Sequence, residues 1–373
     1  MKPFYFDNAA TTKPDKEILI QAAEKLSEEF YNPSATYREA RAVRDILESS
    51  RERLLKFYRG RKLIFTSCGT EADDTAILSF AKRGNIVTSM GEHAAVYKTF
   101  ESLKQKGVEV RYAKLKYGGE VDEEDFLSKI DEKTSFVSIV HVNNETGAVN
   151  DIERLSKLAK AKNPRLIFHT DAVQSFLKIP YNPSENIDLL SVSAHKICAL
   201  KGTGALIYKS DLHINPFIIG GGQESGIRSG TENVLGIKVF ADAAEKYGEK
   251  LRENFDKIAD IKRAFIEKLD KKYFKIISPE NSSPYILCIS AVSLRGETIQ
   301  SIMDDEGYII GKGSACSSKA PHSRVLKAFE NDAKILDGAL RISFIYDTNK
   351  EEALSLAEKL NEVTEKLYKK INL

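Results

Sequence analysis

The stretch SVSAHKICALKGTGALIY, from Ser191 to Tyr208, decides which fold the sequence favours. It places Ser193, His195 and Lys196 between an apolar run and a glycine-rich turn that leads into a second apolar run. Two apolar runs joined in this way predict two buried strands, with a polar turn at the end of the first. Lysine is rarely buried without a reason. The position of Lys196 at the end of a buried strand therefore indicates a functional group.

Short β-rich runs alternate with helix-period segments from about residue 60 to residue 210. The strand candidates are LIFTS, NIVTS, VEVRYAKL, FVSIVHV, RLIFHTD, LLSVSAH and GALIYK. Segments between them, such as EADDTAILSFAKR and DIERLSKLAKAK, have the spacing of amphipathic helices. Near-continuous apolar strands that alternate with helices are typical of a parallel sheet covered on both faces. We therefore predict an α/β large domain with a mostly parallel seven-stranded sheet covered by helices.

The sequence pattern changes after about residue 250. A long helical stretch to Lys272 is followed by the strand candidates FKIIS and YILCISAVS and, from Lys350, by a helix rich in lysine and glutamate. This mixture predicts a smaller α+β domain, and a length of 373 residues fits two domains at ~150 residues per domain. We expect the large domain over residues 15–250 and the small domain over residues 1–14 and 251–373.

The composition favours small-molecule chemistry over nucleic-acid or membrane binding. Lys plus Arg (56) nearly balance Asp plus Glu (54), so the formal net charge is only +2 and no large basic surface is expected. The first residues show no signal peptide, and no run approaches the ~20 apolar residues of a membrane-spanning helix, so we expect a cytoplasmic protein. The four cysteines form no C-x-x-C pair, which argues against a zinc site or a disulfide framework, and no metal is expected.

Polar and titratable residues follow five of the predicted strands. The clusters are Thr66 to Glu71, Glu92 with His93, His141 to Glu145, His169 to Gln174, and Ser191 to Lys196. In open α/β sheets, ligands bind beyond the carboxyl ends of the strands. A solvated loop explains any single cluster equally well, but five clusters together predict one binding site at this edge of the sheet.

Three of these clusters have the chemistry of the three ends of pyridoxal 5'-phosphate (PLP). The stretch TSCGTEA opens a helix after a strand, so Gly69 and Thr70 lie where backbone N–H groups bind an anion, although an ordinary helix N-cap explains the pattern equally well. Asp171 suits the pyridinium nitrogen, or else it caps the next helix. Lys196 is placed to form a Schiff base with the aldehyde. A solvent-facing Lys196, with Lys201 as the rival lysine, is the alternative.

Three further residues fit an enzyme that acts on an amino acid with this cofactor. His93 in GEHAA suits stacking on the ring and proton transfer near neutral pH, with helix capping as the alternative. Arg341 in GALRISF suits bidentate binding of a substrate carboxylate, with a structural salt bridge as the alternative. Cys316 lies in YIIGKGSACSSKAPHSRVL, residues 308–326, where glycine, serine and proline predict a mobile loop and basic neighbours favour a reactive thiol.

The motifs together resemble the cysteine desulfurases, a branch of the class V aminotransferase superfamily of fold-type I PLP enzymes. The matching stretches are YFDNAATT, YNPSATYR, FTSCGTEADD, EHAAV, HVNNETGAVNDI, HTDAVQS, SVSAHKI with KGTGAL, GGGQESGIRSGTEN, GKGSACSS and LRISF. They span almost the whole chain, and the pair SAHK and GSACSS is specific. Cys68 stands where the family usually has glycine, and Asp74 stands where asparagine is common.

The resemblance implies a role for each site residue. Lys196 would carry PLP, with Asp171 on its pyridinium nitrogen, His93 stacked on its ring, and Asn144 and Gln174 at its phenolic oxygen. The phosphate would be held by Gly69, Thr70, Ser193 and His195, joined by Thr231 of a second subunit. The substrate carboxylate would be held by Asn32 and Arg341, and the nucleophile would be Cys316. The protein would then be an obligate homodimer with two shared active sites.

The resemblance implies that L-cysteine is converted to L-alanine and that its sulfur passes to Cys316 as a persulfide, for delivery to an acceptor protein. The alternatives are a selenocysteine lyase, another class V activity such as transamination, and a non-catalytic sulfur-binding paralogue. Transamination needs no thiol, and every expected catalytic residue is present, so the last two are disfavoured. The chain ends at KKINL without the extended tail with which related enzymes dock an iron–sulfur scaffold, so the acceptor, including one for iron–sulfur cluster biogenesis, stays open.

Overall fold

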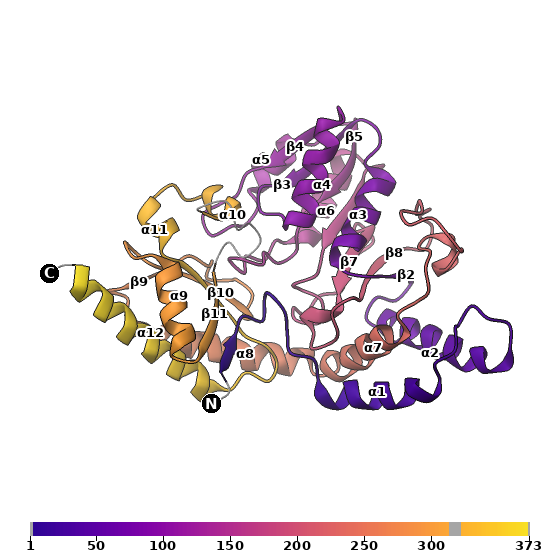
Figure 1. Cartoon of the computed structure of the whole chain (residues 1–373). Helices are drawn as coiled ribbons and strands as arrows, with labels where there is room; N and C mark the ends of the chain where they lie inside the picture. The colour runs from indigo at the N-terminus through magenta and orange to yellow at the C-terminus, as the bar shows by residue number, and fades with distance from the viewer. Residues whose placement is uncertain (1–2, 313–321, 372–373) are drawn as a thin grey trace.

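Two sheets form the core of the protein, as Figure 1 shows. The computed structural model describes residues 3–312 and 322–371. The larger sheet has the strand order β2-β8-β7-β6-β5-β3-β4, with β2 (Arg61–Thr66), β3 (Asn85–Ser89), β4 (Glu109–Ala113), β5 (Thr134–Ser138), β6 (Ile167–Asp171), β7 (Leu189–Ser193) and β8 (Gly204–Lys209). Each strand overlaps one of the seven predicted runs. The predicted α/β fold with a mostly parallel seven-stranded sheet is therefore confirmed.

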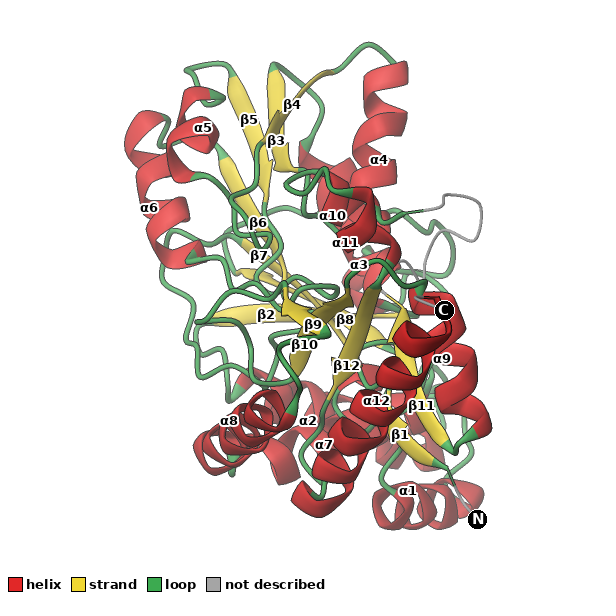
Figure 2. Cartoon of the chain, turned by 90° about the vertical axis from the view of Figure 1, so that its left-hand side faces the viewer, coloured by secondary structure: helices red, strands yellow, loops and turns green. Residues whose placement is uncertain are grey.

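Helices cover the larger sheet on both sides. They are α1 (Lys16–Glu28), α2 (Arg38–Leu55), α3 (Gly69–Phe80), α4 (Ala94–Gln105), α5 (Glu123–Ser128), α6 (Ile152–Lys162) and α7 (Val234–Gly248), with short 3-10 turns at Ala194–Lys196 and Glu224–Gly226. Figure 2 shows α4 on one side of the strands and α5 and α6 on the other. Neighbouring strands are parallel except where β8 runs antiparallel to both β2 and β7. The crossovers therefore bring the carboxyl ends of most strands to one edge.

The smaller sheet is mixed and has the order β1-β11-β12-β10-β9. Its strands are β1 (Phe4–Phe6), β9 (Phe274–Ile276), β10 (Ile286–Ala291), β11 (Tyr308–Lys312) and β12 (Ala339–Ser343), and the helices of this part are α8 (Leu251–Lys268), α9 (Gly296–Asp305), α10 (Arg324–Lys327), α11 (Ala333–Asp337) and α12 (Lys350–Ile371). The strand candidates FKIIS and YILCISAVS correspond to β9 and β10. In the described part of the chain, no helix is both long and apolar enough to cross a membrane.

The loop predicted over residues 308–326 is wrong for its first five residues, which form β11, and for its last three, Arg324 to Leu326, which belong to α10. Strand β11 pairs with β1 on one side and with β12 on the other. Gly311 lies opposite Arg341, and a Cβ on Gly311 would lie 2.5 Å from Asp7 Oδ1 and 3.0 Å from Arg341 Nε. The glycine that suggested a loop is therefore the residue that lets β11 pass close to these two side chains.

The segment between β1 and α1 joins the two sheets, as the dark indigo trace in Figure 1 shows. We call residues 7–12 the N-terminal bridge. Ala9 N donates to Ser343 Oγ of β12 at 2.8 Å, and Thr12 N donates to the carbonyl oxygen of His195 at 2.9 Å. The bridge is thus bonded to the smaller sheet near one end and to the turn after β7 at the other.

We predict that Gly147 tolerates substitution less well than Gly60. Both have a positive φ, 75° and 76°, which costs alanine roughly 1–2 kcal/mol. A Cβ on Gly147 would also lie 2.7 Å from Ile286 O of β10, whereas one on Gly60 meets nothing within 4 Å. Gly147→Ala should lower the free energy of unfolding by more than ~2 kcal/mol and Gly60→Ala by ~1–2 kcal/mol in urea denaturation. Equal losses would show that the approach of this loop to β10 is not a constraint.

Candidate active site

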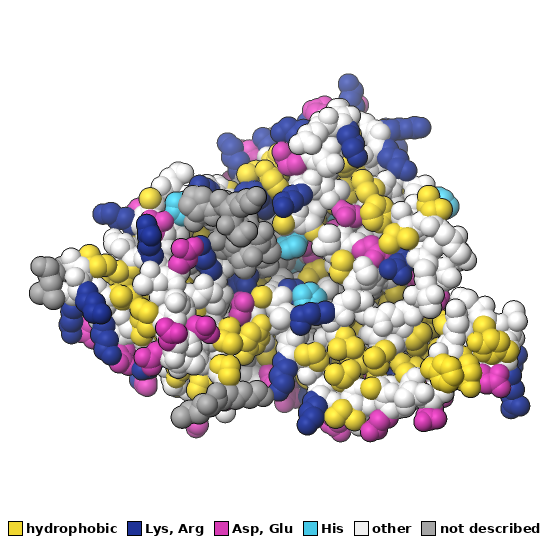
Figure 3. Space-filling view, in the orientation of Figure 1, with side chains coloured by type: hydrophobic (Ala, Val, Ile, Leu, Met, Phe, Trp, Pro, Cys, Tyr) yellow, Lys and Arg dark blue, Asp and Glu magenta, His cyan; other side chains and the backbone are white. Residues whose placement is uncertain are grey.

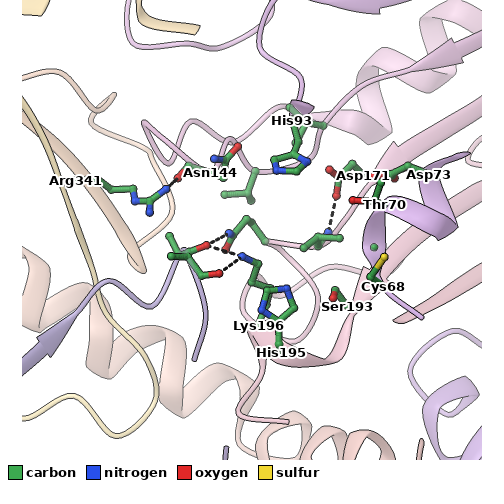
Figure 4. A pocket seen from close by; sticks show the side chains of 17 residues that line it. Cys68, Thr70, Asp73, His93, Asn144, Asp171, Ser193, His195, Lys196 and Arg341 are labelled. Atoms are coloured by element: carbon green, nitrogen blue, oxygen red, sulfur yellow. Dashed lines mark hydrogen bonds between the residues drawn. The ribbon is translucent and has the colours of Figure 1, made fainter. Parts of the chain in front are cut away.

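A cavity of about 320 Å³ lies where the ends of β6 and β7, the start of α3 and the N-terminal bridge meet (Figure 4). The structure brings ten of the residues that the sequence singled out to its wall: Gly69, Thr70, His93, Asn144, Asp171, Gln174, Ser193, His195, Lys196 and Arg341. Nine of these residues come from all five strand-end clusters, with His93 in the loop before α4, and Arg341 comes from the smaller sheet. The cavity is therefore shared between the two sheets.

The N-terminus of α3 offers an anion-binding position in this cavity. Its N-cap residue, Cys68, makes no capping hydrogen bond through its side chain. Ser193 Oγ is buried and has no hydrogen-bond partner among the described residues. A Cβ on Gly69 would lie 2.8 Å from Val173 Cγ2, so this position favours glycine. An uncapped helix N-terminus beside an unpartnered hydroxyl suits a phosphate group.

Asp171 is the last residue of β6 and is 4% exposed. It makes the local capping contact that the sequence left as an alternative, because its Oδ1 accepts from Val173 N at 2.9 Å. Burial raises the pKa of Asp171, and the nearby His93 and Lys196 oppose this rise. A cationic ligand would offset the cost of burying the carboxylate. A protonated pyridine nitrogen is a ligand of this kind.

Lys196 reaches the cavity from the 3-10 turn that follows β7. Its Nζ donates to Ala9 O at 2.7 Å and to Ala10 O at 2.8 Å, both in the N-terminal bridge (Figure 4). These two carbonyl groups hold the amine at the cavity wall. Lys201, the rival lysine, is exposed and does not line the cavity. The geometry therefore favours Lys196 as the reactive amine.

His93 caps α4 and lines the cavity at the same time. Its Nδ1 accepts from Ala95 N at 3.2 Å, so the capping alternative holds for one ring nitrogen. Figure 4 shows the ring between Asn144 and Asp171. Burial lowers the pKa of His93, while Asp171 acts in the opposite direction. Burial disfavours the charged form of the His93 ring, and the hydrogen bond to Nδ1 fixes its orientation. A neutral ring held in this way suits stacking on a planar ligand.

Arg341 on β12 combines a structural ion pair with an unused N–H group. Its side chain is 2% exposed, and its guanidinium donates to Asp7 Oδ1 at 2.7 Å and to Asn144 O at 2.9 Å. The salt-bridge alternative is therefore present. Its Nε is buried without a hydrogen-bond partner among the described residues. A buried donor without a partner favours a further acceptor, such as a substrate carboxylate.

Among the described residues, two of the predicted ones, Asn32 and Thr231, do not line this cavity. Asn32 and Thr231 are exposed and line a separate hollow of about 250 Å³, together with Phe30 and Leu235. Cys316 lies outside the described residues. The sequence expectation that Thr231 acts from a second subunit is compatible with its separate location and stays a prediction.

Asp73, which the sequence pattern did not single out, lines the cavity and is 1% exposed. Its Oδ1 lies 3.6 Å from His169 Nε2. Burial and the charge of Asp171 hold the pKa of Asp73 well above its usual range. The signal that could have found it is an acidic residue on the otherwise apolar face of α3 that Ala72 and Ala76 define.

Comparison with known proteins gives matches over nearly the whole chain. Residues 4–356 match the family model described as aminotransferase class-V. A protein of Dictyoglomus turgidum named cysteine desulfurase IscS is 36% identical over 375 residues, covering 97% of this chain and 95% of that protein. A solved structure described as a NifS-like protein is 32% identical with a TM-score of 0.90, covering 97% of this chain and 99% of its own. A structure described as SspA in complex with cysteine is 30% identical with a TM-score of 0.81, covering 91% and 98%.

Glu92, next to His93, is a fully buried acid beside the cavity. Its Oε1 accepts from Ser89 Oγ at 2.6 Å and from Val140 N at 3.1 Å, and its Oε2 has no hydrogen-bond partner among the described residues. Burial raises the pKa of Glu92 to about 8. The folded protein therefore keeps this carboxyl group protonated at neutral pH.

We predict that Glu92→Gln stabilises the protein increasingly as the pH rises. An unfolded glutamate has a pKa of ~4.3, so between about pH 4.3 and pH 8 the folded state keeps a proton that the unfolded chain has lost, and stability falls through this window. Glutamine does not ionise, so the unfolding free energy of Glu92→Gln should exceed that of the unsubstituted protein by an amount that grows by up to ~1.4 kcal/mol per pH unit. Denaturant unfolding at several pH values measures this, with the exposed Glu24→Gln as control. A difference for Glu92→Gln that is constant with pH would contradict the prediction.

Proposed function

The chain belongs to the class-V aminotransferase family, and we propose that within this family it is a PLP-dependent cysteine desulfurase that passes the sulfur of L-cysteine to Cys316. The proposal is supported by the relative of 36% identity that is named cysteine desulfurase and by the related structure of 30% identity described in complex with cysteine. The observation that carries it is the meeting of Lys196, Asp171 and the N-terminus of α3 around one cavity of about 320 Å³.

The chemistry of these three positions fits PLP. The amine of Lys196 suits the aldehyde, and the buried carboxyl of Asp171 suits the ring nitrogen. Thr70 suits the phosphate together with Ser193 Oγ, which has no hydrogen-bond partner in the described part of the chain. Gln174 and Asn144 line the same wall and suit the phenolic oxygen. When bound, PLP withdraws electrons from the substrate Cα. This weakens the bond between Cα and its proton and the bond between Cβ and sulfur.

The residues of the chain have distinct tasks in the proposed reaction. Lys196 Nζ takes the Cα proton of L-cysteine and returns a proton when L-alanine forms. Asp171 stays ionised once a cationic partner offsets its burial, and it holds that partner in place. Arg341 Nε donates to the substrate carboxylate, which orients the amino acid in the cavity. His93 forms the wall on which the planar ligand rests.

Cys316 is proposed as the nucleophile on the strength of the GSACSS motif, and the residues on either side of its segment support this. Before the segment, Gly311 of β11 lies opposite Arg341. After it, Ser323 Oγ donates to Glu145, which directly follows a cavity residue. The thiol of Cys316 takes the sulfur of L-cysteine, so that one thiol and one L-cysteine give one persulfide and one L-alanine. The persulfide sulfur then passes to an acceptor protein.

A second copy of the chain completes the site in this proposal by supplying Thr231 to the phosphate. Thr231 is exposed and lies in the hollow that Phe30 also lines. Phe30 is 72% exposed and Tyr37 is 48% exposed, and Figure 3 shows apolar side chains gathered on the surface in the region of α1. Exposed apolar groups of this kind favour a protein interface. The protein therefore acts as a homodimer.

The first test of this proposal concerns Lys196. The PLP-loaded protein with L-cysteine and a thiol reductant should release sulfide and L-alanine in equal amounts, and borohydride should fix a pyridoxyl label on Lys196. Lys196→Ala should lower the rate of L-alanine formation by at least ~10³-fold, because the reactive amine is lost. Lys201→Ala, at the exposed rival position, should keep both label and turnover. A label on Lys201 in place of Lys196 would refute the assignment.

A second test concerns Cys316. Cys316→Ala should still bind PLP but should gain no sulfur from L-cysteine, because the acceptor thiol is absent. The measurement is mass spectrometry of the unreduced protein, with one added sulfur expected on the Cys316 peptide before substitution. Cys68→Gly removes the thiol at the cavity wall and is the control. Loss of the added sulfur in Cys68→Gly, with normal turnover in Cys316→Ala, would assign the nucleophile to Cys68.

A further inference from the structure

Lys178 is a buried lysine in the segment that follows β6, and it does not itself line the cavity. Its side chain is 1% exposed. Among the described residues its Nζ makes a single hydrogen bond, to Gln174 Oε1 at 3.2 Å, and it lies 6.0 Å from the centre of the Tyr285 ring. A lysine with this degree of burial usually has a carboxylate partner. Lys178 instead donates to the amide oxygen of Gln174.

Gln174 connects Lys178 to Lys196. Its Nε2 donates to Ala9 O at 2.8 Å, and the same Ala9 O accepts from Lys196 Nζ at 2.7 Å. Gln174 is 5% exposed and lines the cavity. Three hydrogen bonds thus lead from a buried amine to the cavity amine through one side-chain amide and one carbonyl group.

We propose that Lys178 is a positioning residue for the reactive amine, which it controls by fixing the orientation of the Gln174 amide. The proposal rests on the proposed function, in which Lys196 carries the cofactor. The N–H groups of Lys178 require an oxygen, so the Gln174 oxygen faces Lys178 and its NH2 group faces Ala9 O. The second N–H of this NH2 group remains a donor at the cavity wall. Without Lys178 the amide is free to rotate and to present its oxygen to Ala9 O and Lys196.

The charges around Lys178 reinforce this role. The ionisable groups that interact with it are Lys196, His195 and Cys198, with Tyr285 beyond them. Burial, together with the charge of Lys196, lowers the pKa of Lys178 to about 7, and Cys198 acts in the opposite direction. Two amines that share a poorly solvated site do not both hold a proton readily. Lys178 therefore loses its proton near neutral pH, and it acts on Gln174 through its N–H groups and not through a fixed charge.

Lys262 shows how a purely structural lysine is buried in the same chain. It is 7% exposed, and its Nζ donates to Ser282 Oγ at 2.7 Å, to Ser283 O at 2.8 Å and to Ile286 O at 2.9 Å. All three of its N–H groups are used locally. Lys178 has one acceptor, and that acceptor lines the cavity. Lys262→Met is accordingly the matched control for Lys178→Met.

The experiment treats the cofactor-free protein with trace acetic anhydride at several pH values and measures the acetylation of Lys196 by mass spectrometry. The pH at which this acetylation is half-maximal is the pH midpoint for Lys196. Lys178→Met removes the N–H groups that orient the Gln174 amide, so Ala9 O loses its fixed second donor and binds the protonated Lys196 more strongly. The pH midpoint for Lys196 should therefore rise by roughly 0.5–1 unit. Lys262→Met should leave the midpoint unchanged. An unchanged midpoint in folded Lys178→Met overturns the proposal.

Gln174→Leu separates a relay through Gln174 from a general loosening of the site. It keeps Lys178 but removes the second donor to Ala9 O, so it should raise the Lys196 midpoint in the same direction. The double variant should shift the midpoint little beyond the larger single shift, because both changes break one connection. Fully additive shifts would overturn the proposal. If Lys178→Met does not fold, Gln174→Leu still decides, since an unchanged midpoint there also overturns it.

Borohydride reduction of the PLP-loaded, unsubstituted protein distinguishes failure of this inference from failure of the proposed function. Absence of a pyridoxyl label on Lys196 overturns both. A label on Lys196 together with an unchanged midpoint in Lys178→Met overturns the role of Lys178 alone.

Discussion

The candidate site depends on the carbonyl oxygen of Ala9. It accepts hydrogen bonds from Gln174 Nε2 and from Lys196 Nζ, which is 187 residues away in the sequence, while Ala9 N donates to Ser343 Oγ of the smaller sheet. One residue of the N-terminal bridge therefore links the reactive amine to both sheets. Because a peptide group is planar and its carbonyl direction is fixed by the backbone, a shift of the bridge moves the amine with it. The first residues of the chain are thus part of the site.

The buried acids explain why the cavity favours a ligand that carries both signs of charge. Asp73, Glu92 and Asp171 all have raised pKa values, with burial as the main cause, so the protein alone does not compensate their ionised forms. The start of α3, which has no side-chain cap, and Ser193 Oγ favour a negatively charged group on the ligand. Groups left unsatisfied by the fold itself are expected where a ligand completes the structure. A ligand with a cationic ring and an anionic phosphate satisfies both demands.

The parts of the fold and the site that the sequence predicted are those set by local pattern. Most of the seven strands were predictable because burial produces apolar runs, whereas β4 is exposed or half-buried over most of its length and was predicted from its β-rich residues. Asp171 and Lys196 were found because they follow buried apolar runs. The pairing of Gly311 with Arg341 was not predictable, since the reason for that glycine lies on another strand. The role of Ala9 was equally hidden, because a carbonyl contact depends on the backbone and leaves no mark in the residue type.

The two sheets contribute different halves of the proposed chemistry. The larger sheet and α3 hold the groups suited to PLP, whereas Arg341 belongs to β12 and the segment that contains Cys316 begins where the neighbouring strand β11 ends. Paired strands lie ~4.8 Å apart, so the group proposed for the substrate carboxylate and the start of the nucleophile's segment have a fixed separation. In the proposed function, the group for the substrate carboxylate and the start of the nucleophile's segment therefore belong to one sheet. The N-terminal bridge, bonded to Ser343 on that sheet and to Lys196 beside the other, links them to the amine proposed to remove the Cα proton.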